Sequence, residues 1–249
     1  EALRERSLSM DILIDFDIGL HRTGIQPADA MELAGDILSR PALRLRGIQA
    51  YAGQVQHIPS YDARKAASHL SLEKAVTAFH QLQSVSETCT IFSSSGTGTF
   101  DIDLVVPAVT ELQAGSYVCM DAEYLAIGSV EDPTHFASFE PALGLLTTVV
   151  SANQEGFVTV DAGLKAMYKD GGTPQVLGPE YSGVMYTWFG DEYGMIICPD
   201  QVKAPSLGTV LELVTSHCDP TVNLYDRYYV VRGMDVVDVW PIDLRGCSQ

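Results

Sequence analysis

Over its first half, the chain alternates apolar, strand-like runs with longer amphipathic runs, and this pattern limits the folds open to it. The strand-like runs end in polar loops rich in Gly, Ser or Thr. Repeated strand-then-helix units imply parallel strands joined by right-handed crossovers. In a (β/α) barrel, the loops that follow the strands carry the chemistry. The predicted strands are 11–19, 45–51, 90–95 and 111–118, and the predicted helices begin at Pro27 and after Ser60.

The rhythm changes after about residue 140, where short β-rich runs are separated by Gly and Pro. We therefore expect a partial (β/α)8 TIM-like barrel at 1–138, followed by an antiparallel β domain at 139–249. A complete barrel needs eight strands and roughly 250 residues, so the first part amounts to about half of one. The predicted strands of the second part are 143–151, 157–161, 184–188, 194–198, 209–214, 222–231 and 235–240.

Composition narrows the expected partners. A net charge of −17 repels nucleic acid and anionic lipid, so we expect neither as a partner. No apolar run reaches the length of a membrane span, and the opening residues have no signal-peptide core. The five cysteines are scattered without a CxxC pair, which fits a reducing, cytoplasmic compartment.

The first predicted strand leads into a turn with one arginine. Gly19 allows a sharp reversal, and Arg22 then projects from the carboxyl end of the strand. A guanidinium there can hold an anionic or phenolate oxygen by charge-assisted hydrogen bonds. A surface ion pair with Asp17 is an equally good interpretation from the residues alone.

A Gly- and hydroxyl-rich loop, SSSGTGT at 93–99, follows the third predicted strand. Such a loop presents backbone N–H groups that suit a phosphate, and a barrel commonly builds its phosphate site from two neighbouring loops. Many Gly/Ser/Thr loops bind nothing, so the motif alone leaves both interpretations open. The candidate phosphate-binding residues here are Ser94, Gly96 and Thr97.

His217 and Asp219 form an H-x-D pair in the second part of the chain. On an extended segment, residues two apart point to the same side, so both could ligate one divalent cation. Imidazole plus carboxylate suits Mn²⁺ or Mg²⁺, whereas a thiolate would favour Zn²⁺. Cys218, between them, is expected to face away. The spacing is common by chance and is also compatible with a structural role.

Together these motifs resemble the D-threonine aldolase/D-serine dehydratase family of alanine-racemase-like, fold type III pyridoxal-phosphate enzymes. Aldolase members carry H-x-D where dehydratase members carry H-x-C, so the resemblance is greater to D-threonine aldolase. Gln54 and Tyr193 stand where many relatives carry His. The resembling strings are D-x-G-x-x-R-x-G at 17–24, V-D-A-G-L-K-A at 160–166, G-D-E-Y-G at 190–194 and H-C-D-P-T-V-N-L at 217–224.

The resemblance implies roles for individual residues. His57 would be the base that acts on the β-hydroxyl of the substrate, although a loop histidine is more often simply solvated. The implied cofactor contacts are Arg22 to the phenolic oxygen, Tyr51 near the ring as a further catalytic candidate, Gln113 at the pyridine nitrogen, and the amides of Gly115 and Ser116 at the phosphate.

The implied reaction is retro-aldol cleavage of D-threonine and other D-3-hydroxy amino acids to glycine and an aldehyde, in a homodimer. It would use pyridoxal 5′-phosphate and Mn²⁺, Mg²⁺ or Zn²⁺ on His217 and Asp219. Dehydration of D-serine or D-3-hydroxyaspartate is the alternative reaction, and an inactive fragment is the alternative of another class.

The family's Schiff-base lysine lies near its N-terminus in an R-P-H-x-K-T-like setting. None of the lysines here has that setting. We therefore expect that an N-terminal part is lacking and that activity requires it. The lysines are Lys65, Lys74, Lys165, Lys169 and Lys203.

Overall fold

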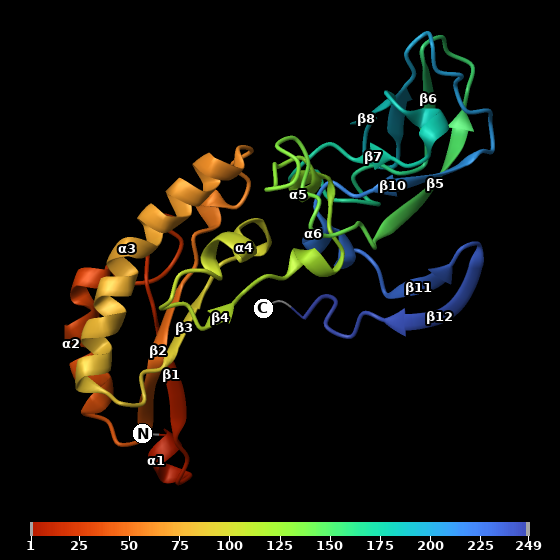
Figure 1. Ribbon diagram of the computed structural model, residues 1–249. Coiled ribbons are helices and arrows are strands. Elements are labelled where there is room, and N and C mark those ends of the chain that lie inside the picture. Colours follow the sequence, from red (N-terminus) through yellow and green to blue (C-terminus); the bar gives the residue numbers. More distant parts are fainter. Residues whose placement is uncertain (1, 248–249) are drawn as a thin grey trace. The chain divides into compact units, whose positions relative to one another are not determined.

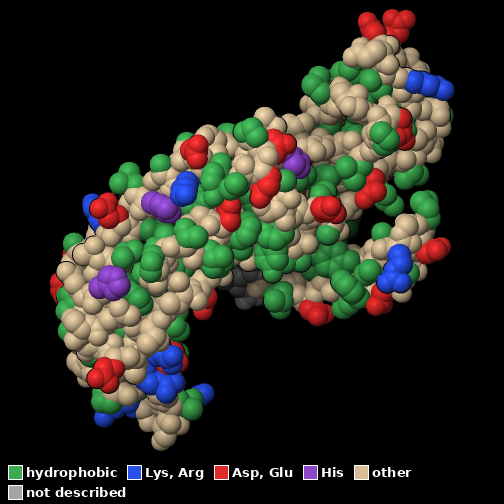
Figure 2. Space-filling view, in the orientation of Figure 1, with side chains coloured by type: hydrophobic (Ala, Val, Ile, Leu, Met, Phe, Trp, Pro, Cys, Tyr) green, Lys and Arg blue, Asp and Glu red, His purple; other side chains and the backbone are tan. Residues whose placement is uncertain are grey.

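The computed structural model describes residues 2–247, which form two compact units (Figure 1). Unit 1 holds residues 2–115 and 127–134, and unit 2 holds residues 116–126 and 135–247. Acidic side chains are spread over the face seen in Figure 2 and basic ones are few, in line with the net charge of −17. Within the described residues, we find no helix that combines the length and the apolar character of a membrane span.

Unit 1 is built on a four-stranded parallel sheet in the order β1-β2-β3-β4, which confirms the predicted partial barrel. The predicted strand 111–118 is much shorter than expected. It ends after Leu112, and a 3₁₀ turn (η4) follows at Ser116–Val118. The strands are β1 (Met10–Asp15), β2 (Leu43–Ala50), β3 (Ile91–Ser94) and β4 (Glu111–Leu112).

Two helices, α2 and α3, cover one face of this sheet (Figure 1). The predicted cap of the longer one is confirmed, because Ser60 Oγ accepts a hydrogen bond from the Ala63 amide at 3.3 Å. Pro27 begins the 3₁₀ turn that leads into α2, as its fixed φ favours. The helical elements are α1 (Ala2–Glu5), η1 (Pro27–Asp29), α2 (Ala30–Leu38), η2 (Gly53–Val55), α3 (Tyr61–Val85), η3 (Thr97–Thr99) and α4 (Phe100–Asp103).

The core of unit 1 lies between the sheet and these helices. Burial of large apolar side chains from both layers is the main stabilising contribution, at about 1.5–3 kcal/mol for each side chain. The sheet contributes Ile14, Leu45, Ile48 and Phe92, and the helices contribute Ile37, Leu72, Phe79 and Leu82.

Unit 2 contains a six-stranded antiparallel sheet in the order β7-β10-β5-β6-β9-β8, which confirms the predicted β domain. A separate hairpin, β11–β12, turns at Gly233. The elements are α5 (Ala122–Leu125), β5 (Gly144–Ser151), β6 (Phe157–Val160), β7 (Gln175–Val176), η5 (Pro179–Tyr181), β8 (Met185–Trp188), β9 (Gly194–Ile197), β10 (Val210–Val214), α6 (Cys218–Val222), β11 (Arg227–Arg232) and β12 (Asp235–Pro241).

The predicted strand 222–231 is wrong in its first half, and so is the extended conformation expected through the H-x-D pair. His217 is extended, but α6 begins at the next residue. The buried carboxylate of Asp121 accepts a hydrogen bond from the Cys218 amide at 2.9 Å and so caps the start of this helix. Pro220 is tolerated because it lies in the first helical turn.

Candidate functional site

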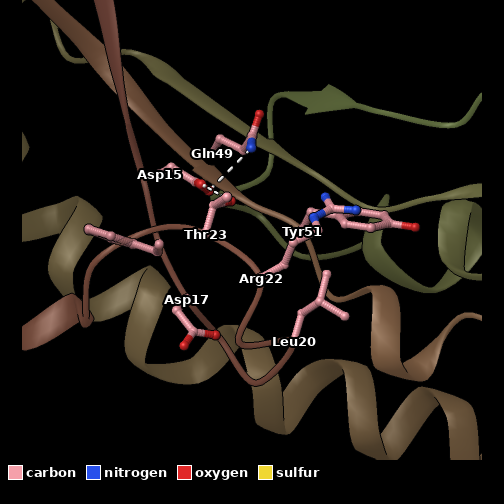
Figure 3. A pocket seen from close by; sticks show the side chains of 8 residues that line it. Asp15, Asp17, Leu20, Arg22, Thr23, Gln49 and Tyr51 are labelled. Carbon is pink, nitrogen blue, oxygen red and sulfur yellow. Dashed lines mark hydrogen bonds between the residues drawn. The ribbon is translucent and has the colours of Figure 1, made fainter. Parts of the chain in front are cut away.

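A pocket lies at the carboxyl ends of β1 and β2 in unit 1 (Figure 3). Parallel strands bring their carboxyl ends to one edge of a sheet, where ligands of α/β folds usually bind. Two predicted cofactor residues, Arg22 and Tyr51, line this pocket together. The lining residues are Asp15, Phe16, Asp17, Leu20, Arg22, Thr23, Gln49 and Tyr51.

Arg22 lies over the ring of Tyr51, with Cζ 5.4 Å from the ring centroid (Figure 3). This cation–π contact holds the guanidinium at the pocket. The Asp17 carboxylate accepts hydrogen bonds from His21 Nδ1 at 2.8 Å and from the amides of His21 and Gly19. These bonds, chiefly that from the His21 side chain, lower the pKa of Asp17 to about 2. Asp17 therefore stabilises its own turn through His21.

Asp15, the last residue of β1, organises the floor of the pocket. Its carboxylate accepts hydrogen bonds from Thr23 Oγ1 at 2.7 Å and from Gln49 Nε2 at 3.2 Å (Figure 3). Our sequence analysis missed these three residues. The alternation of side chains along β1 and β2 could have identified Asp15 and Gln49 as polar residues near strand ends.

His57 is half-buried in the segment between η2 and α3. Among the described residues, the side chains that line the pocket do not include His57. Gln54 Nε2 donates to Ile18 O at 3.2 Å and to Ser71 Oγ at 3.3 Å. Its role in this structure is to fix the turn that follows β2.

The predicted phosphate loop, 94–99, is buried, and several of its polar groups are used within unit 1. Ser94 Oγ donates to Ala50 O at 2.7 Å, and the Gly98 amide donates to Gln56 Oε1 at 3.0 Å. These groups would have to exchange partners to bind a phosphate. All three predicted residues of this loop, Ser94, Gly96 and Thr97, are buried.

A fully buried arginine, Arg64, connects this loop to the His57 segment. Its guanidinium donates to Gly98 O at 2.7 Å, to Ile58 O at 2.7 Å and to Gly128 O at 2.5 Å. Its position in the helix predicted after Ser60 gave no sign of this role. Burial of the charge requires the carbonyl partners, because an unpaired buried guanidinium would be costly.

The loop after β4 holds Gln113, Gly115 and Ser116. Gln113 Nε2 donates to Ser93 Oγ at 3.0 Å, so its side chain lies beside β3. No heavy atom lies within 4 Å of the position that a Cβ on Gly115 would take, so this residue faces open space. The hydroxyl of Ser116, already in unit 2, donates to Asp219 Oδ2 at 2.6 Å.

The H-x-D pair is brought together despite the unexpected helix. His217 Nε2 lies 3.2 Å from Asp219 Oδ2, and His217 Nδ1 lies 3.4 Å from the Asp170 carboxylate. The hydrogen bond with Asp219 is the main cause that raises the pKa of His217 to about 9, and the same bond lowers the pKa of Asp219. Cys218 is buried and its thiol pKa is raised, chiefly by desolvation, so it is not poised as a thiolate ligand.

The donor geometry of the pair fits a divalent cation. Two ligand atoms about 2.1 Å from one ion, at 90–109°, are roughly 3.0–3.4 Å apart. The observed separation of 3.2 Å lies in this range. Over residues 2–247, no group of three or more His, Cys, Asp or Glu side chains is arranged to hold a metal. Among the described residues, a cation on this pair would therefore have only these two side chains as protein ligands.

Two family models match the chain. The model of the alanine racemase N-terminal domain matches residues 1–123, and that of a putative serine dehydratase domain matches residues 142–231.

Individual relatives agree with these models. The chain is 35% identical to a D-threonine aldolase from Arthrobacter sp over 250 residues, which cover 100% of this chain and 64% of the relative. It is 35% identical to a 3-hydroxy-D-aspartate aldolase from Paracoccus denitrificans (strain Pd 1222), over 98% of this chain and 63% of the relative. The crystal structure of D-threonine aldolase from Filomicrobium marinum superposes with a TM-score of 0.90 at 33% identity, over 99% of this chain and 65% of the other. The chain thus spans somewhat less than two thirds of the length of these proteins.

Proposed function

The chain belongs to the alanine-racemase-like family that includes the D-threonine aldolases and D-serine dehydratases. We propose that it functions in a carbon–carbon lyase that depends on pyridoxal phosphate and a divalent metal. The proposed reaction is cleavage of D-threonine and other D-3-hydroxy amino acids to glycine and an aldehyde. The observation that carries the proposal is the convergence of His217 Nε2 and Asp219 Oδ2 at 3.2 Å, an H-x-D pair that fits Mn²⁺ or Mg²⁺.

The donor set of the unit 1 pocket supports a cofactor with an acidic oxygen. Arg22 is a cation at the end of a parallel strand, and Tyr51 fixes its orientation. These two residues would hold the ring of pyridoxal phosphate, with Gln113 at the ring nitrogen and Gly115 and Ser116 at the phosphate. When bound, this cofactor supplies an electron sink for the electrons released at Cα.

The metal pair would hold the cation at the substrate's β-hydroxyl. A divalent cation in this position lowers the pKa of a hydroxyl that binds it. His57 is the proposed base, and one of its ring nitrogens would accept the β-hydroxyl proton as the Cα–Cβ bond breaks. Asp219 is more than half exposed, so its carboxylate is open to a cation from solvent.

Product analysis with D-threonine tests the proposal. With pyridoxal phosphate and Mn²⁺ present, the full gene product should cleave D-threonine to glycine and acetaldehyde in equal amounts. Asp219→Ala should abolish the metal-dependent rate, since a two-ligand site that loses one ligand keeps little affinity. Asp200→Asn, an exposed acid of the same unit, is the matched control. Wild-type cleavage by Asp219→Ala at low metal would contradict the assignment.

Dehydration is the second candidate, and the match of residues 142–231 to a putative serine dehydratase domain favours it. The same substrate separates the two reactions, because dehydration of D-threonine gives 2-oxobutanoate and ammonia. A protein that forms neither set of products would support the non-catalytic interpretation. In that respect, all five lysines are exposed and none lines the unit 1 pocket.

A homodimer belongs to the same proposal. The β11–β12 hairpin supports it, because apolar residues such as Tyr229 and Val231 are more than 60% exposed and a two-stranded hairpin is marginally stable alone. Light scattering after gel filtration should give twice the 27.0 kDa of one chain. A mass of 27.0 kDa at micromolar concentration would contradict this part.

A further inference from the structure

Both ring nitrogens of His217 face a carboxylate. Nε2 lies 3.2 Å from Asp219 Oδ2, whereas Nδ1 lies 3.5 Å from one oxygen of Asp170 and 3.4 Å from the other. Asp170 is 47 residues from His217 in the chain and belongs to no motif that the sequence analysis singled out. The first contact forms the candidate cation site, so the second one requires its own explanation.

The loop that carries Asp170 is bound firmly to the segment that carries His217. Ser216 Oγ donates to Tyr168 O, and the Tyr168 amide donates to Thr221 Oγ1 at 3.2 Å. These two bonds hold the loop that carries Asp170 against the segment that carries His217.

Gly171 permits this close approach. Its φ of +93° lies in the left-handed region, and a Cβ at this position would come within 2.9 Å of Ser216 O and 3.1 Å of His217 Cβ. The contact between Asp170 and His217 is therefore built into the backbone of unit 2.

A carboxylate at Nδ1 determines which nitrogen can bind a cation. A neutral imidazole carries one proton, and the nitrogen that bears it cannot ligate. When a cation occupies Nε2, the one proton of the neutral ring lies on Nδ1, where the Asp170 carboxylate can accept its hydrogen bond. The lone pair of Nε2 then points at the position shared with Asp219. Histidines that bind metals in proteins are usually oriented by such a carboxylate or carbonyl.

We propose that Asp170 is a positioning residue, which orients the His217 ring and keeps its proton on Nδ1 so that Nε2 can bind a divalent cation with Asp219. This inference rests on the proposed function of the pair as a cation site. It adds a residue from another loop, more than half exposed, that does not itself ligate the ion.

Mn²⁺ binding to the 249-residue chain without pyridoxal phosphate tests the proposal, with the electron paramagnetic resonance signal of free Mn²⁺ as the readout. Asp170→Ala should weaken binding by about 10–100-fold, the usual effect of losing such an outer partner. Asp170→Asn should weaken it clearly less, because its amide oxygen can still accept the Nδ1 hydrogen bond. Asp200→Asn removes the same charge elsewhere in unit 2 and should stay within about twofold of wild type.

The pair of Asp170 variants separates positioning from simple charge attraction. If Asp170 acted only through its negative charge, the Ala and Asn variants would weaken binding equally, and that result would overturn the proposal.

Failure of the underlying site is recognised separately. If Asp219→Ala bound Mn²⁺ as wild type does, the cation site itself would be wrong. If Asp219→Ala lost binding while Asp170→Ala matched Asp200→Asn, the site would stand and only the role of Asp170 would fall.

Discussion

Replacement of Arg64 should lower the stability of unit 1 and leave that of unit 2 unchanged. Arg64→Met keeps the length of the side chain but removes the donors to Gly98, Ile58 and Gly128. Each carbonyl left without its donor costs about 1–3 kcal/mol. The substitution also removes a buried charge, and this offsets part of the loss of stability. Burial of that charge lowers the pKa of Arg64 in the wild type. We therefore expect a loss of about 4 kcal/mol, in the lower half of the summed range.

Two optical probes distinguish the units in a urea titration. The 25-residue α3 makes unit 1 the main source of helical circular dichroism at 222 nm. Both tryptophans, Trp188 and Trp240, belong to unit 2, so their fluorescence reports that unit. With a slope of about 2 kcal/mol per molar urea, the dichroism midpoint should fall by roughly 2 M. The fluorescence midpoint should stay near its wild-type value.

Arg44→Met is the matched control. Arg44 is 55% exposed and pairs with Asp11 at 2.7 Å, so its loss should cost less than about 1 kcal/mol. Arg64→Lys should lie between, because an ammonium has no planar fork to reach three carbonyls. If Arg64→Met shifted the dichroism midpoint no more than Arg44→Met does, the carbonyl contacts would not have the stabilising role assigned to them.

Three further predictions use single sites. Gly47→Ala should destabilise unit 1 by more than about 3 kcal/mol in the same urea assay, because the new Cβ would lie 1.8 Å from Ile91 O. As the control, the Cβ of Gly35→Ala in α2 would meet no heavy atom within 4 Å, so this variant should be neutral or stabilising. In EDTA, the stabilisation by the His217–Asp219 pair should be complete below about pH 6.5 and should disappear as the pH rises through about 9. The melting temperatures of wild type and His217→Ala should therefore converge above about pH 9. A constant difference up to about pH 10 would refute the raised pKa of His217. Ser116→Ala removes the 2.6 Å bond to Asp219 and should weaken Mn²⁺ binding by up to about tenfold, while Ser116→Thr should retain most of it.

Local sequence patterns were sufficient to predict the repeating architecture. Period-two apolar runs and a capping residue such as Ser60 depend on neighbours within a few positions, so strands, helices and the switch to an antiparallel domain could be inferred. Arg22 was singled out as a cation at the end of a predicted strand and Tyr51 through the family resemblance, and both line the pocket of unit 1.

Contacts between distant segments decided the rest. The helix at Cys218–Val222 depends on Asp121, which lies 97 residues away and caps it from another segment. In the sequence, Arg64 is one of several charged residues of a helix, and only the tertiary structure brings three carbonyls from separate segments to its guanidinium. Asp170 and Ser116 reach His217 and Asp219 across 47 and 103 residues. Periodicity indicates which face of an element is buried, but only tertiary packing determines which polar groups are buried together and must therefore bond to one another.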